Sequence, residues 1–305
     1  GARDWMTECR GRSWRTPMLR PFVIHEPRSV EEASALLAEH GPEAAAYAGG
    51  TELLVVMKEG LAHFPHLVNL KTIPGLRGIT AENGALRIGA LTTHREIEQS
   101  PVIRERAPAL AALAAQVANI RVRQVGTLGG NLCFAEPHSD PATLLVAWDA
   151  TLHLVSRRGS RAMAAQYFFT GLLQTARAQD EILAEIWVPL PPHGVGTAYE
   201  RFTTHERPIV TVAAVIRVSG SVIDEGRVVI GSVGPRPVRL PAAEAMLTRQ
   251  APSPDLFAAV AERAAADVEI MEERFESVEY RRQLARVLVA RALGAAAGRA
   301  MGGRP

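Results

Sequence analysis

Residues 46–60 of this chain read AYAGGTELLVVMKEG, in which two consecutive glycines separate two apolar runs. The flanks predict a strand that enters a short helix through a glycine turn. Glycine suits such a turn because it adopts backbone angles that other residues avoid and lets another group approach the main chain closely. An anion bound by the free amide groups is one candidate for that group, so the turn is a candidate binding loop.

A second pair of glycines follows in residues 121–150, which read RVRQVGTLGGNLCFAEPHSDPATLLVAWDA. Each pair lies beside a threonine, and the two turns together predict two loops whose amides face one diphosphate, without a helix dipole. Neither matches the P-loop or the G-x-G-x-x-G pattern, and ordinary turns or tight packing also explain a single pair. Asn131 and Asp140 add an amide and a carboxylate suited to sugar hydroxyls.

Composition excludes several classes of protein. The chain has 305 residues, enough for two or three subdomains, and its formal net charge of +2 is too small to indicate nucleic-acid binding. No apolar run approaches the roughly 18 residues of a membrane span. Cys9 and Cys133 supply neither a disulfide framework nor an iron–sulfur cluster. A cytoplasmic location is expected.

The order of predicted elements indicates an α+β protein. Strands and helices alternate up to about residue 120, with a helix over residues 29–41 that Ser29 caps and Glu32 completes as a capping box. An apolar helix is expected over residues 108–120. Strand-rich segments follow after residue 150, and helices close the chain. The domains that we predict are a tail or extension at 1–17, a cofactor domain at 18–192 with subdomains of about 18–75 and 76–192, a C-terminal α+β domain at 193–298, and a tail at 299–305.

The motifs AGGTELL and MKEG, then VRQVGTLGGNLCFAEPHSDPATLL, DEILAEIWVP and SVEYRRQLARVLVARAL, occur in this order. In this the chain resembles the FAD-binding medium subunit of the molybdenum hydroxylases, a family that includes carbon monoxide dehydrogenase and xanthine dehydrogenase. The resemblance covers residues 18 to 295. It implies a two-subdomain FAD-binding domain of the p-cresol methylhydroxylase or vanillyl-alcohol oxidase type, followed by a C-terminal domain like that of the carbon monoxide dehydrogenase flavoprotein.

The same resemblance implies which residues contact FAD. Loop residues would cradle the pyrophosphate, Asp140 would bind hydroxyls, and Leu183 would pack on the rings. Arg201 is the expected cation at the pyrimidine end of the flavin, with Arg207 as a less direct choice, because the family often has a lysine in this segment. At His205 and Pro208 the chain departs from the arginine and acidic residue that are usual in the family, so the residues on the electron-acceptor side of the flavin stay open. The full set of predicted FAD contacts is Tyr47, Ala48, Gly49, Gly50, Thr51, Glu52, Leu53, Gly126, Thr127, Gly129, Gly130, Asn131, Asp140, Leu183 and Arg201.

The resemblance also implies the division of labour in a complex. The molybdenum cofactor would lie in a large subunit and [2Fe-2S] clusters in a small one, in a dimer of heterotrimers, and this oxidoreductase subunit would pass electrons from FAD to NAD, quinone or oxygen. No catalytic side chain and no metal is expected on this chain. The alternatives are a free-standing flavoprotein oxidase or dehydrogenase with its own small organic substrate, and a scaffold that has lost its cofactor.

Several residues have plain structural interpretations beside functional ones. Glu52 either starts a helix or contacts the cofactor. His138 is expected in a turn, although it could reach the cofactor, and Cys133 is expected to be a small apolar residue. His63 and His66 lie three residues apart, but we do not expect them to bind zinc, because no carboxylate is near. Tyr280, Arg281 and Arg282 are expected to serve the C-terminal helix or a subunit contact.

Overall fold

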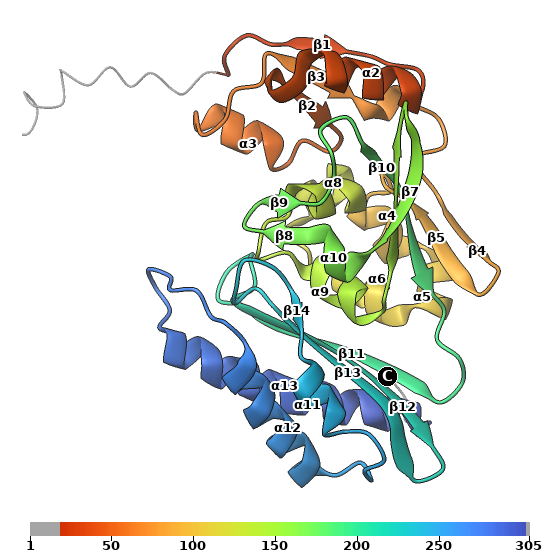
Figure 1. The fold of residues 1–305 in the computed structure, drawn as a ribbon, viewed down its shortest axis with the longest axis vertical. Coiled ribbons are helices and arrows are strands. Elements are labelled where there is room, and N and C mark those ends of the chain that lie inside the picture. Colours follow the sequence, from red (N-terminus) through yellow and green to blue (C-terminus); the bar gives the residue numbers. More distant parts are fainter. Residues whose placement is uncertain (1–18, 303–305) are drawn as a thin grey trace, which may run out of the picture.

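The computed structural model describes residues 19–302, so the predicted tail at 1–17 lies outside the described residues. Three layers are stacked along the long axis of the molecule, each built on its own β-sheet (Figure 1). The predicted α+β fold class is confirmed. At the other end of the chain the last helix continues to Ala300, into the segment predicted as a tail.

The first layer is a three-stranded parallel sheet in the order β1-β3-β2. Its helix α2 begins at Ser29, whose hydroxyl accepts a hydrogen bond from the amide of Glu32 at 3.1 Å. The Glu32 carboxylate accepts from the amide of Arg28 rather than Ser29, so the predicted capping box is displaced by one residue. The elements are β1 (Val23–His25), α2 (Val30–His40), η1 (Gly41–Glu43), β2 (Ala44–Tyr47), α3 (Leu53–Lys58), β3 (His66–Asn69) and η2 (Leu70–Thr72).

The middle layer is a five-stranded antiparallel sheet in the order β4-β5-β10-β6-β7, with a two-stranded sheet and short helices beside it. Its strands are β4 (Ile79–Glu82), β5 (Ala85–Gly89), β6 (Thr151–Ser156), β7 (Gly159–Ala164), β8 (Phe169–Gly171), β9 (Gln174–Thr175) and β10 (Ile182–Pro189). Its helices are α4 (His94–Gln99), α5 (Pro101–Arg106), α6 (Pro108–Ala114), α7 (Ile120–Val125), α8 (Leu128–Phe134), α9 (Asp140–Ala147) and α10 (Ala165–Phe168).

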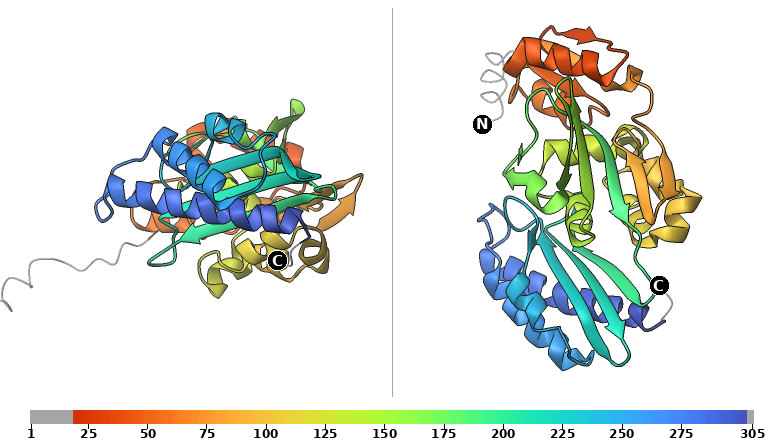
Figure 2. Two further views of the ribbon diagram at one scale, coloured as in Figure 1. Left: turned by 90° about the horizontal axis from the view of Figure 1, so that it is seen from below. Right: turned by 45° about the vertical axis from the view of Figure 1, so that its right-hand side comes forward.

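The third layer is a four-stranded antiparallel sheet in the order β11-β12-β13-β14. Helices α12 and α13 lie along its outer face (Figure 2), and α9 of the middle layer packs against β12 and β13 from the other side. The apolar run of β12 follows from this arrangement, because Val212 and Ala214 belong to one core and Ala213 to the other. The elements are β11 (Val195–Phe202), β12 (Val210–Ser219), β13 (Val222–Gly231), β14 (Val238–Arg239), α11 (Pro241–Ala245), α12 (Pro254–Asp267) and α13 (Val278–Ala300).

Two helix predictions in the middle layer need correction. The apolar helix expected over residues 108–120 ends at Ala114, because Ala118 adopts a φ of 42° and Asn119 caps a new helix, α7. The second pair of glycines was expected in a turn and lies instead in the first turn of helix α8. Helix propensity argues against two glycines in a helix, but a Cβ at Gly129 would collide with Ala90 and one at Gly130 would lie 2.8 Å from the Thr127 hydroxyl.

Candidate functional site

One large cleft, with a volume of about 860 Å³, lies where the three layers meet. That volume is near the upper end of the roughly 300–1,000 Å³ typical of small-molecule sites. The cleft takes residues from the first layer, from the segment after β5, from α8 and its flanks, and from the loop after β11. Thirteen of the fifteen predicted site residues line it: Ala48, Gly49, Gly50, Thr51, Glu52, Leu53, Gly126, Thr127, Gly129, Gly130, Asn131, Asp140 and Leu183.

The first glycine loop connects β2 to α3. Gly50 has a φ of 74°, in the left-handed region, and its carbonyl accepts the first helical hydrogen bond from Leu54 at 3.0 Å. Within residues 19–302, the amides of Gly50, Thr51 and Glu52 donate no hydrogen bond. Consecutive amides left free beside a cleft are suited to an anionic group.

The second glycine loop, residues 126–131, is held by backbone hydrogen bonds to residues 90–92, which follow β5. The amide of Gly129 donates to Ala90 O at 2.8 Å, and that of Leu128 to Thr92 O at 3.0 Å. A Cβ at Gly129 would lie 2.5 Å from the Cβ of Ala90, so only glycine permits this approach. The Thr127 hydroxyl accepts from the amide of Gly130 at 3.1 Å and caps α8.

The two glycine loops touch each other through backbone. A Cβ at Gly49 would lie 2.4 Å from the carbonyl oxygen of Val125 and 2.8 Å from the Cα of Gly126. On the other side, a Cβ at Gly130 would lie 3.8 Å from the Cβ of Ala48. Tight packing therefore explains these glycines, because it lets the two loops form one wall of the cleft. A diphosphate shared by the two loops stays a prediction.

Asp140 begins helix α9 at the edge of the cleft, where only 4% of the residue is exposed. Its Oδ1 accepts a hydrogen bond from the Tyr199 hydroxyl at 2.7 Å and lies 3.1 Å from Nη1 of Arg201. Burial raises the pKa of Asp140 to about 6, against the opposing effects of Arg201 and Tyr199. Oδ1 of Asp140 thus already interacts with two residues of β11 in the third layer.

Two predicted contacts lie outside the cleft lining. Tyr47 ends β2, and its ring packs under Gly50 and against Lys71, whose Nζ lies 3.9 Å from the ring centroid. Arg201 is largely buried, with Nη1 donating to Gln116 O at 2.7 Å besides the ion pair with Asp140. These two residues support the walls, and the expectation that they face the cofactor is not supported by their positions.

Arg207 supplies a cation to the cleft lining from the loop between β11 and β12. Its Nη2 lies 3.1 Å from Glu52 Oε2 in the first glycine loop, and its Nη1 lies 3.2 Å from Glu136 Oε1 after α8. Glu52 is the N-cap residue of α3, without a side-chain capping bond, and it lines the cleft, so its place at the helix start is confirmed and its contact with the cofactor stays a prediction. Arg207 links the third layer to both walls.

Sequence reasoning did not identify several cleft residues. His94, at the start of α4, is 3% exposed, and its amide donates to Gly126 O at 3.0 Å. Burial, aided by Arg123, lowers its pKa to about 4, so this imidazole is neutral at pH 7. The capping box between Thr93 and Glu96 was the available local signal, because it fixes where α4 begins.

His138 and Cys133 both line the cleft. His138 lies in the turn between α8 and α9, with Nδ1 2.9 Å from Glu136 Oε1 and Nε2 3.1 Å from Glu273 Oε1. The hydrogen bond to Glu136 raises the pKa of His138, although burial opposes it. Burial also raises the pKa of the Cys133 thiol, which favours the neutral form and agrees with a small apolar role.

A large cleft lined by two glycine-rich loops, with free amides and a mostly apolar surface, has the features of a site for an extended phosphate-containing cofactor. The chain belongs to the family described as the FAD binding domain in molybdopterin dehydrogenase, whose model matches residues 20–191. The CO dehydrogenase flavoprotein C-terminal domain matches residues 198–296. It is therefore an FAD-binding medium subunit of the carbon monoxide and xanthine dehydrogenase type, an oxidoreductase subunit.

Named relatives agree over nearly the whole chain. It is 35% identical over 277 residues to the carbon monoxide dehydrogenase medium chain of Hydrogenophaga pseudoflava, covering 90% of this chain and 96% of that one. It is 31% identical over 281 residues to the caffeine dehydrogenase subunit beta of Pseudomonas sp. (strain CBB1), covering 91% and 95%. A solved structure of the Hydrogenophaga carbon monoxide dehydrogenase lacking the Mo-pyranopterin moiety superposes with a TM-score of 0.90 at 35% identity, covering 92% and 99%.

Within residues 19–302, no helix has both the length and the apolar character that crossing a bilayer would require.

Proposed function

We propose that this chain transfers electrons within a complex, taking them from the iron–sulfur clusters of a small subunit and passing them to an external acceptor. A large subunit with the molybdenum cofactor would oxidise the substrate, and the assembly would be a dimer of heterotrimers. The observation that carries the proposal is that two family models match residues 20–191 and 198–296, and that the chain is similar over nearly its whole length to chains named as medium or beta subunits of dehydrogenases. Those relatives are named for substrates as different as carbon monoxide and caffeine, which supports the proposal that another subunit chooses the substrate.

The residues of the cleft fit FAD. The free amides of Gly50, Thr51 and Glu52 would hold the pyrophosphate, with the first turn of α8 facing it across the contact between the loops. Leu53 and Leu183 offer apolar surface to the rings. Buried Asp140 would position hydroxyls while Tyr199 and Arg201 hold its other oxygen. Bound FAD supplies the chemistry, since it stores two electrons and exchanges them singly or in pairs.

We assign to Arg207, in place of Arg201, the role of the cation beside the flavin. Replacing Arg207 with alanine should lower the flavin midpoint potential, because a nearby positive charge stabilises the anionic reduced form. The side chain is 55% exposed, so we expect an effect of about 1 kcal/mol, on the order of 20 mV for two electrons. Equilibrium redox titration of the flavin absorbance measures it.

Arg217→Ala is the matched control, because Arg217 is similarly exposed, forms ion pairs with Asp224 and Glu225, and lies on β12 outside the cleft lining. Arg207→Lys should keep a flavin midpoint potential close to that of the parent chain, because lysine also carries a positive charge. An Arg207→Ala variant with the potential of the parent chain would remove Arg207 from this role.

The electron-transfer function is tested by purifying the tagged chain from cells that express its native partners, and measuring flavin, iron and molybdenum per chain. Iron and molybdenum should co-purify with bound flavin and be lost when the chain is expressed alone. A chain that carries flavin without metals from native cells, and oxidises a small organic molecule by itself, would favour the free-standing flavoprotein. A chain without flavin in both preparations would indicate a scaffold.

A further inference from the structure

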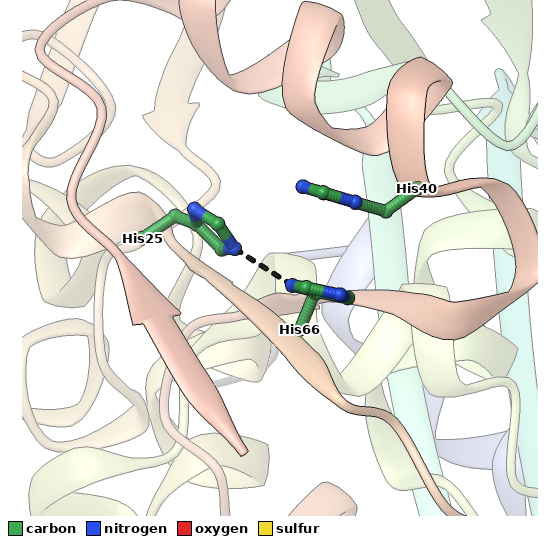
Figure 3. A group of neighbouring side chains, drawn as sticks. All are labelled: His25, His40 and His66. Carbon is green, nitrogen blue, oxygen red and sulfur yellow. Dashed lines mark hydrogen bonds between the residues drawn. The ribbon is translucent and has the colours of Figure 1, made fainter.

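Three histidines converge on the outer part of the first layer, away from the cofactor cleft. His25 ends β1, His40 ends α2 and His66 begins β3. One ring nitrogen from each lies within 4.8 Å of those of the other two, and Figure 3 shows the three imidazoles facing one another. None of the three is among the residues that line the cleft. The cluster therefore requires an explanation separate from FAD binding.

The register of the parallel strands places two of these rings on one face of the sheet. Val23 of β1 lies opposite His66 of β3, and His25 lies two residues further along β1. Because side chains alternate between faces, Val23 and His25 share the face of His66. Helix α2 packs against β2 and β3, and its last residue, His40, reaches this group just before Gly41 ends the helix. The arrangement is fixed by backbone elements rather than by a mobile loop.

The three rings contact one another directly. His25 Nε2 lies 3.0 Å from His66 Nδ1, so one ring donates its proton to the lone pair of the other. The rings of His40 and His66 are stacked, with centroids 3.8 Å apart and planes 5° from parallel. Burial and the neighbouring His40 and His66 lower the pKa of His25, while Glu39 opposes this shift. Half-buried imidazoles whose ring nitrogens lie this close together are suitable ligands for a transition-metal ion.

We propose that His25, His40 and His66 form a binding site for a divalent transition-metal ion, with Zn²⁺ as the ion of choice and water in the fourth position. Zinc–nitrogen bonds of about 2.0–2.1 Å place two ligand nitrogens of a tetrahedral site about 3.3 Å apart. The His25 and His66 nitrogens already lie close to this spacing, at 3.0 Å, and a ring nitrogen of His40 lies within 4.8 Å of both. Zinc would replace the hydrogen bond between His25 and His66, and the ring that donates in that bond would pass this proton to solvent and take one up on its other nitrogen, so that both facing nitrogens offer lone pairs.

The site is tested with the full chain and Zn²⁺ as the probe, by equilibrium dialysis followed by metal analysis. We expect about one zinc ion per chain, with binding weakened at least about 10-fold in His40→Ala and in His25→Ala, because even the loss of a hydrogen-bond partner of a metal ligand costs about 10- to 100-fold. His63→Ala is the matched control, since His63 is exposed, lies three residues before His66 and is outside the cluster. That variant should bind zinc as the parent chain does.

A second readout separates this site from adventitious zinc elsewhere. Added Zn²⁺ should raise the melting temperature of the parent chain and of His63→Ala, and leave those of His25→Ala and His40→Ala unchanged, because an ion that binds only the folded state stabilises it. Flavin content should be the same in all four proteins. Zinc binding that is equal in all four, or no zinc binding by the parent chain, would overturn the proposal and leave the cluster as a packing contact.

Discussion

Replacing Gly130 or Gly50 with valine is expected to abolish FAD retention and leave the fold intact. At Gly130 the new Cβ would lie 2.8 Å from Thr127 Oγ1, the atom that caps α8, and its branches would press on Ala48 in the facing loop. At Gly50 valine would be forced to a φ of 74°, with its Cβ 2.6 Å from the Tyr47 ring. Both changes move the amides that we assign to the pyrophosphate.

The expected loss of affinity is large because the lost hydrogen bonds go to a charged group. Each such bond contributes about 1.5–3 kcal/mol, so losing two weakens binding by a factor of about 100 or more. The measurement is the flavin absorbance retained after mixing the purified chain with FAD and desalting, with circular dichroism to show that the variants fold. Gly298→Val in α13 is the control, because a Cβ there meets nothing within 4 Å.

Flavin retained at normal affinity by both the Gly50 and the Gly130 variants would defeat the model of two cooperating loops. Loss in only one variant would assign the pyrophosphate to that loop alone.

Replacing Arg281 with methionine is expected to destabilise the chain by about 3–5 kcal/mol. The Arg281 side chain is fully buried on α13, donates to Met271 O at 2.8 Å and to Ser232 O, and lies 3.1 Å from Glu273 Oε1. Methionine fills much of the same space but cannot donate, so two carbonyl oxygens lose this donor and the Glu273 carboxylate keeps only His138. Urea unfolding of the two proteins, followed by circular dichroism, measures the difference.

The control for this experiment is Arg286→Met on the same helix. Arg286 is 45% exposed and pairs with Glu262 at 2.9 Å, so we expect a loss below about 1 kcal/mol. If the Arg281 variant were no less stable than the Arg286 variant, the buried arginine would not be what ties α13 to the segments at Ser232 and Met271. A reduced FAD affinity of the Arg281 variant would further indicate that Glu273, which contacts both Arg281 and His138, shifts His138 in the cleft when Arg281 is lost.

The sequence by itself determined the features that depend on neighbours within one or two turns of chain. Ser29 caps the start of helix α2 and Gly41 caps its end, because capping interactions act over three or four residues. In the first glycine turn, Gly50 adopts the positive φ that a glycine at this position indicates. The ordered motifs also identified the family and its FAD-binding function, which the matches over residues 20–191 and 198–296 confirm.

Only the tertiary structure decided which side chains meet. The second pair of glycines lies in the first turn of helix α8. Gly129 is needed there because Ala90, some 40 positions earlier, leaves no room for a side chain. Arg201 lies behind the cleft lining, in an ion pair with Asp140, and Arg207 is part of the lining, where it pairs with Glu52. In the sequence the nearest histidine to His66 is His63, but in the structure His66 forms its hydrogen bond with His25 on the neighbouring strand β1. Such contacts depend on how strands register and layers stack, which no local pattern encodes.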